Sequence, residues 1–186
     1  MIYTDIDIRE AINSGEFKID PYSPELIGPC SIDVRLSESF ARLVANDYNR
    51  VIDPRNSNTF SHEWIRAEEY IIFPGEFVLG ATLETVHIGP SIVGELTGRS
   101  SFGRLALLIH ATAGLVDSGF HGTLTLELAN LGGNAIKLRA GDVIGQIVIY
   151  QTKSKCAVTY GERKYSKYQN QVHATGSKYY QDFQKD

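Results

Sequence analysis

The sequence lacks the usual features of secreted, membrane-bound or nucleic-acid-binding proteins. Its 186 residues include only two cysteines, Cys30 and Cys156, with no CxxC pair, so a disulfide framework and a zinc site are both poorly supported and a reducing cytoplasm is favoured. No apolar run approaches the ~20 residues of a membrane helix, and the N-terminus is acidic where a signal peptide would be basic. The net charge of -4 argues against general binding to nucleic acid or membrane surfaces. We therefore expect a cytoplasmic protein without nucleic-acid or membrane partners.

What the chain does contain is a dense group of anion-binding residues. Seven consecutive positions hold two arginines, two serines and two glycines: Gly98, Arg99, Ser100, Ser101, Phe102, Gly103 and Arg104. Glycines allow backbone N–H groups to come close to a ligand, hydroxyls donate hydrogen bonds, and guanidinium groups clamp phosphate oxygens. This segment predicts a phosphate-binding loop.

A second candidate lies about two dozen residues later, in an apolar alternating run. Residues 123–128 read as a strand, which places Glu127 on the same face as Thr123 and Thr125. A carboxylate in such a strand is costly to bury unless it is hydrogen-bonded or used. A strand glutamate is more often a solvent-facing residue, so Glu127 is a catalytic candidate because of the loop that precedes it.

The expected fold is mainly β, a distorted barrel or jelly roll. Thr4 and Gly15 are the expected caps of a short N-terminal helix, with Ile8, Ala11 and Ile12 inward. Strands are expected at 17–19, at 30–36 and, from Tyr70 onward, in short apolar runs at 70–73, 77–82, 92–96, 105–110, 123–128, 135–138 and 143–150. Residues 46–68 are polar and predict a long excursion with little regular structure. Asp33 and Arg35 share one face of their strand and are expected to pair.

The chain is expected to form a single domain, residues 1–186. It divides into the helix (1–15), the β-barrel (16–155) and a C-terminal arm (156–186). The arm is polar, aromatic and basic, a composition that rarely forms a core. It is expected to order over a ligand or a neighbouring subunit.

Several motifs in register resemble the dCTP deaminase family of the dUTPase-like superfamily. They are Ser31-Ile32-Asp33-Val34-Arg35-Leu36, Pro74-Gly75-Glu76-Phe77, the loop from Gly98 to Leu105, Thr112-Ala113-Gly114, Asp117-x-Gly119-Phe120-x-Gly122, Leu126-Glu127, Gly145-Gln146, Tyr160 and Lys167-Tyr168-Gln169-x-Gln171. The resemblance implies the dUTPase-like fold, a homotrimer with shared active sites, dCTP and dUTP as ligands, and dTTP as an inhibitor.

The resemblance also implies residue roles. Glu127 would activate water without zinc, and Ser100, Arg104 and the Ala113 carbonyl would hold the water and the glutamate. Asp117 would bind the sugar 3′-hydroxyl, while Thr125, Leu126 and Glu127 would line the base pocket. The phosphates would meet Arg99, Ser100, Ser101, Phe102, Gly103, Arg104, Gln146, Tyr160, Lys167 and Gln171. Mg²⁺ would be bound through the substrate triphosphate, whose hard oxygens suit it.

One departure concerns the product. Deaminase-only relatives often carry His-Arg where this chain has Gly114-Leu115, a pair closer to dUTPases and to bifunctional enzymes that form dUMP. The smaller pair would leave room for a second water near the α-phosphate, oriented by Asp117. The resemblance therefore implies bifunctionality at Gly114, Leu115 and Asp117.

Two other functions remain open at this point. A dUTPase without deaminase activity would share the barrel and Asp117 but would not require Glu127 or the spacing of Ser100 and Arg104. A non-catalytic nucleotide-binding regulator could use the same scaffold. His110, at the end of an apolar run, is expected to be a packed histidine rather than a base.

Overall fold

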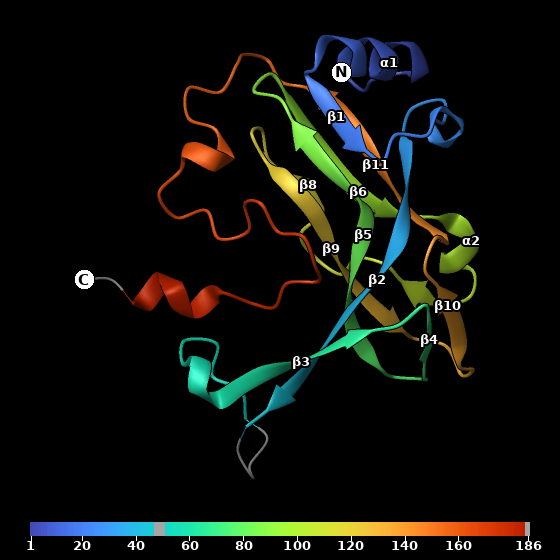
Figure 1. The fold of residues 1–186 in the computed structure, drawn as a ribbon, viewed down its shortest axis with the longest axis vertical. Helices are drawn as coiled ribbons and strands as arrows, with labels where there is room; N and C mark the ends of the chain where they lie inside the picture. The colour runs from blue at the N-terminus through green and yellow to red at the C-terminus, as the bar shows by residue number, and fades with distance from the viewer. Residues whose placement is uncertain (47–50, 185–186) are drawn as a thin grey trace.

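The computed structural model describes residues 1–46 and 51–184. It shows a curled β-sheet with a short helix at one end and the C-terminal arm along one side (Figure 1). The α-helices are α1 (Asp5–Ser14) and α2 (Ser100–Gly103). The strands are β1 (Phe17–Asp20), β2 (Ile32–Ala45), β3 (Phe60–Arg66), β4 (Glu69–Ile72), β5 (Phe77–Ile88), β6 (Ile92–Gly98), β7 (Leu107–Leu108), β8 (Leu115–Val116), β9 (His121–Asn130), β10 (Ile136–Arg139) and β11 (Val143–Gln151). Short 3₁₀ turns are η1 (Pro24–Leu26), η2 (Ser57–Thr59), η3 (Tyr160–Glu162) and η4 (Tyr179–Phe183). The expectation of a mainly β fold with a short N-terminal helix is confirmed.

Helix α1 begins and ends where its capping residues predict. Thr4 forms a capping box with Asp7, and Gly15 closes the helix in the left-handed conformation at φ 78°. Ile8 and Ala11 are buried against the sheet and Ile12 is partly buried. No helix within the described ranges is long and apolar enough to cross a membrane.

The main sheet runs in the order β7-β9-β5-β2-β11-β6-β8, with β1 added to β5 and β3 added to β2. Strands β4 and β10 form a separate antiparallel pair. The inner faces of these strands share one apolar core that includes Ile32, Val34, Leu36, Leu126 and Leu128. Strand β9 lies between β7 and β5, and its pairing with β5 fixes the face that Glu127 presents.

The expected pair between Asp33 and Arg35 is wrong. The Arg35 backbone N–H and Nε donate to the two carboxylate oxygens of Glu84, at 2.8 and 2.6 Å, and Glu84 is fully buried. Asp33 instead lies 3.6 Å from the Arg99 guanidinium. Glu84 lies within an irregularity of the β5–β9 register, between Ala81 and Thr85, where its carboxylate turns inward to β2.

The expectations for residues 46–68 and for residues 105–110 also differ from what the structure shows. The described part of residues 46–68 contains η2 and β3, and β3 pairs with β2 over seven residues, whereas residues 47–50 lie outside the described residues. The expected strand at 105–110 is reduced to the two residues of β7. Ala106 has a positive φ of 63°, a conformation that a strand cannot contain.

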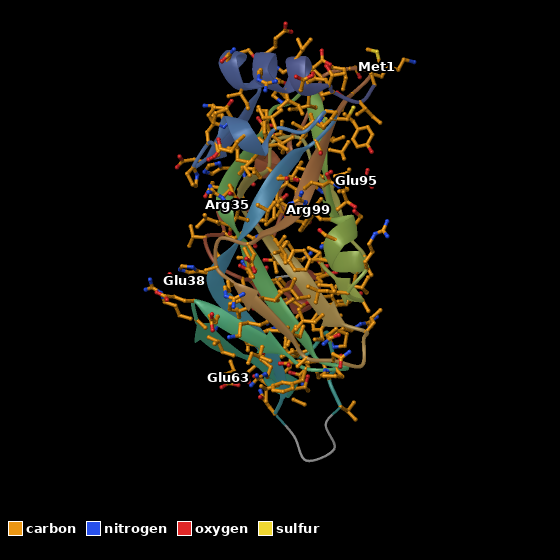
Figure 2. All side chains as sticks on the ribbon, turned by 90° about the vertical axis from the view of Figure 1, so that its right-hand side faces the viewer. Met1, Arg35, Glu38, Glu63, Glu95 and Arg99 are labelled. Carbon is orange, nitrogen blue, oxygen red and sulfur yellow. The ribbon has the colours of Figure 1, made fainter. Side chains whose placement is uncertain are left out.

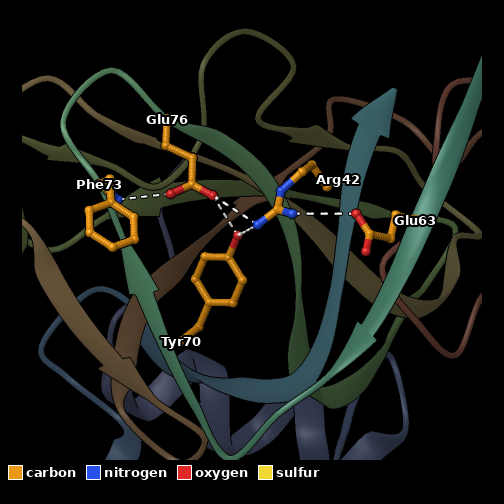
Figure 3. Close-up of polar contacts among 5 residues, drawn as sticks. All are labelled: Arg42, Glu63, Tyr70, Phe73 and Glu76. Atoms are coloured by element: carbon orange, nitrogen blue, oxygen red, sulfur yellow. Dashed lines mark hydrogen bonds and ion pairs between the residues drawn. The ribbon is translucent and has the colours of Figure 1, made fainter. Parts of the chain in front are cut away.

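A polar network fixes the turn between β4 and β5 (Figure 3). The Tyr70 hydroxyl donates to Glu76 at 2.6 Å and accepts from Arg42 at 3.1 Å. The other Glu76 oxygen accepts the Phe73 N–H at 2.8 Å, and Arg42 also reaches Glu63 at 3.3 Å. Burial and the Glu76 carboxylate raise the pKa of Tyr70. The network therefore ties β2, β3 and β4 to the start of β5.

The arm runs along the open side of the sheet and reaches the β2–β3 hairpin (Figure 1). Gln171 bridges to Gly122 in the parallel sense, and Thr123 N–H donates to the Gln171 carbonyl at 2.9 Å. Near the end of the arm, the Arg55 guanidinium lies 4.4 Å from the centre of the Phe183 ring. The arm is thus ordered against its own chain.

Candidate active site

A cavity of about 590 Å³ lies between β9, β8 and the arm. The predicted site residues among its lining are Ala113, Gly114, Leu115, Asp117, Thr125, Glu127, Tyr160 and Gln171. Apolar side chains from β2, β5 and β6 complete the wall, among them Leu43, Phe77, Leu79 and Leu96. An apolar cavity with a few converging polar groups is the usual form of a small-molecule site.

Glu127 presents its carboxylate to this cavity. Its Oε2 atom accepts the backbone N–H groups of Ala111 at 2.9 Å and Thr112 at 3.1 Å. The Glu127 side chain is 26% exposed. Within the part of the chain that the structure describes, Oε1 receives no hydrogen bond, so this oxygen is available to a ligand. The neighbouring Leu126 side chain is buried in the core, and that residue can contribute only its main chain to the site.

His110 is packed, as the sequence predicts, but its position beside Glu127 was not foreseen. Its side chain is 11% exposed, and Nδ1 lies 4.0 Å from Glu127 Oε2. Both ring nitrogens are buried without a hydrogen-bond partner among the described residues. The signal available in the sequence is its place immediately before Ala111 and Thr112, whose N–H groups hold Glu127.

Gly114 occupies a position with no space for a side chain. Its carbonyl accepts the Leu96 N–H at 2.7 Å, and a Cβ on Gly114 would lie 2.7 Å from the Leu96 carbonyl oxygen. This contact brings the Gly114-Leu115 segment onto β6, where Leu115 begins β8 opposite Glu95. Any residue larger than glycine here must displace the backbone.

The Asp117 carboxylate is exposed at the mouth of the cavity. A turn from Asp117 to Phe120 holds it, closed by a 3.1 Å hydrogen bond from Phe120 N–H to the Asp117 carbonyl. Gly119 has a φ of +84° in this turn, as the third residue of a type II turn requires. This turn leads directly into β9, which carries Glu127.

The predicted phosphate-binding loop lies outside this cavity on the same chain. None of its residues from Arg99 to Arg104 lines the cavity of Glu127. The loop forms α2, on the face of Figure 2 that bears the Arg35 and Arg99 labels. Ser100, Ser101, Gly103 and Arg104 are exposed there. The expectation that Ser100 and Arg104 hold Glu127 is therefore not met within one chain, and it stays a prediction for a site shared between subunits.

Gly98 and Gly103 were expected to bring backbone N–H groups close to a ligand, but within one chain neither glycine is seen in that role. The Gly103 N–H is used inside the helix, donating to the Arg99 carbonyl at 3.0 Å, and a Cβ at Gly103 would meet nothing within 4 Å. Gly98 packs against Ile109, 3.3 Å from the position of a Cβ. Within the chain, packing explains Gly98, and nothing in the structure explains Gly103.

Gln146 lies on the loop side. Its Oε1 accepts the Ser31 hydroxyl at 2.8 Å, and its Nε2 donates to the Gly98 carbonyl at 3.3 Å. Arg99 and Asp33 form their 3.6 Å ion pair on the same sheet region. Burial raises the pKa of Asp33, while the Arg99 guanidinium acts in the opposite direction.

The arm residues lie on the cavity side. The Tyr160 ring lies 5.7 Å from that of Phe120, and the Tyr160 hydroxyl accepts the Tyr168 N–H at 3.2 Å. The Gln171 Nε2 donates to the Thr123 carbonyl at 2.6 Å, whereas its Oε1 is buried without a partner among the described residues. Lys167 is paired with Asp182 at 2.7 Å and lines a smaller cavity of about 370 Å³ that also includes Tyr160.

The predicted site residues thus fall into two groups on one chain. The cavity group contains Ala113, Gly114, Leu115, Asp117, Thr125, Glu127, Tyr160 and Gln171, with Lys167 beside it. The loop group contains Arg99, Ser100, Ser101, Phe102, Gly103, Arg104 and Gln146. The first group offers a carboxylate and an apolar wall, and the second offers cations and hydroxyls, so each supplies what the other lacks.

The described residues do not form a metal-binding cluster. Among residues 1–46 and 51–184, no three His, Cys, Asp or Glu side chains gather closely enough to hold a metal ion. The donor set therefore does not fit a protein-built zinc or magnesium cage. An ion carried by the phosphates of a ligand is compatible with this donor set.

The chain belongs to the dCTP deaminase-like family, whose sequence profile matches residues 2–152. Its relatives include proteins named "dCTP deaminase, dUMP-forming". One, from Corynebacterium jeikeium (strain K411), is 46% identical over 188 residues and covers 99% of this chain and 100% of the relative. Another, from Methanospirillum hungatei JF-1, is 40% identical over 184 residues and covers 98% of each.

A solved structure with the same fold is 2′-deoxycytidine 5′-triphosphate deaminase from Agrobacterium tumefaciens. The TM-score is 0.60 at 18% identity, over 80% of this chain and 47% of that one. The present chain thus matches about half of the length of that protein. The likeness supports the expected fold and carries no conclusion about chemistry.

Proposed function

We propose that this protein hydrolyses dCTP to dUTP and ammonia and continues to dUMP and pyrophosphate. The observation that carries the proposal is the Glu127 carboxylate, held by two backbone N–H groups in a cavity that also contains the Asp117 carboxylate. The family and the names of the relatives that align along nearly the whole chain support the same reaction.

Glu127 is the proposed general base. The N–H groups of Ala111 and Thr112 hold Oε2, which leaves Oε1 to take a proton from water. The water oxygen attacks C4 of cytosine, and the Glu127 carboxyl passes the first proton to N3. The carboxylate then takes the second proton from the new C4 hydroxyl and delivers it to the amine, which leaves as ammonia while the C4 carbonyl forms. A positioned acid or base contributes about 10²–10⁴-fold to such a step. The products of this step are dUTP and ammonia.

The second reaction uses the other end of the cavity. A water placed by Asp117 attacks the α-phosphorus of dUTP, the α–β bond breaks, and pyrophosphate leaves with dUMP as the product. The lack of a side chain at Gly114 supports this assignment, because it lets the backbone of the segment before Asp117 pack against the Leu96 carbonyl oxygen, 2.7 Å from where a Cβ would lie. Asp117 is also the proposed ligand of the sugar 3′-hydroxyl.

A complete site requires two copies of the chain. Arg104 and Ser100 are exposed on α2 and do not line the cavity of Glu127. A ring of identical subunits would bring the loop group of one subunit to the cavity group of the next, since a heterologous interface repeats the same contact around the axis. We propose a homotrimer in which the phosphates meet the loop group, with Tyr160, Lys167 and Gln171 supplied by the arm.

Mg²⁺ is proposed as a substrate-borne ion. The described chain offers no cluster of carboxylates for it, whereas triphosphate oxygens are ligands that Mg²⁺ prefers. When bound, the ion would neutralise phosphate charge. On the loop side, the Asp33 carboxylate lies 3.6 Å from the guanidinium of Arg99, a predicted phosphate ligand.

Regulation and location follow from the same proposal. dTTP shares the deoxyribose and triphosphate of the substrate, so we expect it to occupy the site and inhibit the reaction. Cys30 and Cys156 are both free, which is compatible with the reducing cytoplasm where a deoxynucleotide pool is found.

Product analysis tests the proposed function. The purified protein is incubated with dCTP and Mg²⁺, and ammonia, dUTP, dUMP and pyrophosphate are measured over time. We expect ammonia and dUMP in equal amounts. Accumulation of dUTP would limit the protein to deamination. Hydrolysis of dUTP without ammonia from dCTP would favour the dUTPase alternative, and binding without turnover would favour a regulator.

A further inference from the structure

The turn that carries Asp117 is held by the sheet on one side and by the arm on the other. On the sheet side, Gly119 N–H donates to the Ile88 carbonyl at 2.7 Å and Ile88 N–H donates to the Phe120 carbonyl at 3.0 Å. Tyr160 N–H donates to the Ser118 carbonyl at 2.8 Å, and Asn170 N–H donates to the His121 carbonyl at 2.7 Å. A Cβ at Gly119 would lie 2.3 Å from the Thr159 Cβ, so the arm and the turn are in close contact. The docking of residues 159–170 therefore adds a second set of contacts to a turn that the sheet also holds.

Gln169 contributes to this contact through its side chain. Its Nε2 donates to the Gly119 carbonyl at 3.0 Å, and its Oε1 accepts the His121 N–H at 3.1 Å. The side-chain amide thus donates to the residue before Phe120 and accepts from the residue after it, as a peptide group of a neighbouring strand would. Gly161 fits closely around it, because a Cβ there would lie 2.8 Å from Nε2.

The hydrogen bonds of Glu127 are made differently. Its carboxylate is held by the backbone of Ala111 and Thr112, in the segment before β8. Gln169 contacts neither of these residues nor Glu127 in any hydrogen bond of the described chain. A loss of the Gln169 contacts should therefore disturb the Asp117 turn more than the Glu127 carboxylate.

We propose that Gln169 is a positioning residue that locks the Asp117 turn to the arm. Docking of the arm then completes the placement of the Asp117 carboxylate in the cavity, so the arm affects both sugar recognition and α-phosphate cleavage. The inference rests on the proposed function, in which Asp117 binds the sugar and orients the second water. It predicts that Gln169 affects these two roles more than deamination.

The test compares Gln169→Leu with Gln181→Leu in the full-length protein. Leucine keeps most of the volume and removes both hydrogen bonds, and Gln181 is an exposed arm glutamine of η4. With dCTP as substrate, we expect Gln169→Leu to lower the ratio of dUMP to dUTP by about tenfold, the effect of losing one to two hydrogen bonds. Gln181→Leu should keep the wild-type ratio.

A second readout does not depend on phosphate cleavage. Dideoxy-CTP lacks the 3′-hydroxyl that Asp117 is proposed to bind, so the wild-type protein should prefer dCTP in kcat/KM for ammonia release. Gln169→Leu should reduce that preference towards the level of Asp117→Asn. Equal loss of ammonia release from both nucleotides, or no change in either readout, would overturn the inference.

Gln169→Glu provides a variant with a built-in rescue. The carboxylate still accepts the His121 N–H, but it places an oxygen against the Gly119 carbonyl. Protonation restores a donor, so the dUMP share of this variant should rise as the pH is lowered, with no such rise in the wild type. A dUMP share with the same pH dependence in both proteins contradicts the inference, even if Gln169→Leu does not fold.

The Asp117→Asn variant separates the two levels of the argument. If it leaves both the product ratio and the dideoxy preference unchanged, the proposed role of Asp117 is wrong, and the inference fails with it. If it changes them while Gln169→Leu does not, only the inference about Gln169 fails.

Discussion

The Oε2 atom of Glu127 accepts the backbone N–H of Ala111 at 2.9 Å. The Thr112 N–H reaches the same oxygen at 3.1 Å. These donors fix the direction of the carboxylate without using a side chain, and among the described residues the second oxygen has no hydrogen bond. The carboxylate is therefore oriented before any substrate binds.

Glu127→Gln should abolish most ammonia release while leaving dCTP binding intact. The amide oxygen can still accept the two N–H groups, but the group no longer takes a proton from water, and we expect a loss of about 10²–10⁴-fold in kcat. Single-turnover kinetics and calorimetric titration with dCTP would measure the two effects. Ammonia release at a near-normal rate would reject Glu127 as the base.

Gly114→Ala should change the product more than the rate of deamination. A Cβ at this position would lie 2.7 Å from the Leu96 carbonyl oxygen, so the segment before Asp117 must move. We expect dUTP to accumulate from dCTP, as chromatography would show. Gly133→Ala is the matched control, because a Cβ there meets nothing within 4 Å; equal effects of the two changes would contradict the assignment of Gly114.

Arg35→Met should strongly destabilise the protein. The change leaves the fully buried Glu84 carboxylate without its ion pair, and breaking such a pair costs about 3–5 kcal/mol. Denaturant unfolding would measure the loss, and adding Glu84→Gln should recover part of it because the buried charge is removed. Arg66→Met breaks the exposed pair with Glu38 and should shift the unfolding midpoint little. Equal shifts for the two arginines would mean that the buried pair has no special weight.

The docking of the arm should weaken in acid. Burial lowers the pKa of His62, whose ring lies against Gly176 so closely that a Cβ there would be 2.2 Å from Cε1. The pKa of His62 is lower in the folded state than in the unfolded state, so between these two pKa values the unfolded state binds more protons. The contribution of neutral His62 to folding stability is therefore complete above about pH 6.5 and is lost as the pH falls through the folded-state pKa. Between about pH 7.5 and about pH 5.5, the midpoint of thermal unfolding should fall further for the wild type than for His62→Phe. Parallel pH profiles would exclude His62 as the cause.

Local signals predicted much of the fold. Thr4 and Gly15 defined α1 because caps act within one turn of the chain. The alternation of Ile32, Val34 and Leu36 predicted the buried face of β2, and the same rule placed Glu127 opposite the core residues Leu126 and Leu128.

Features that depend on distant partners were not predicted. Glu84, the true partner of Arg35, lies 49 residues away, and only the register of β5 against β2 brings it there. Strand β3 is polar because much of it is exposed, so the period that marks a half-buried strand is weak. Residues 105–110 are apolar like a strand, but the positive φ of Ala106 interrupts them.

The candidate site shows the same division. The residue types of the loop and of Glu127 pointed to phosphate binding and to base chemistry. The sequence could not show that the loop residues from Arg99 to Arg104 stay outside the cavity of Glu127. Leu96 of β6 still lines that cavity, and only the tertiary structure shows that the following α2 does not.

Subunit mixing tests the central claim most directly. Glu127→Gln and Arg104→Ala proteins, each inactive alone, are unfolded together in equal amounts and refolded. If each site combines Glu127 of one subunit with Arg104 of the next, random assembly should make about one quarter of the sites wild-type, and ammonia release from dCTP should recover to about that fraction. A mixture no more active than the separate variants would contradict a site shared between two copies.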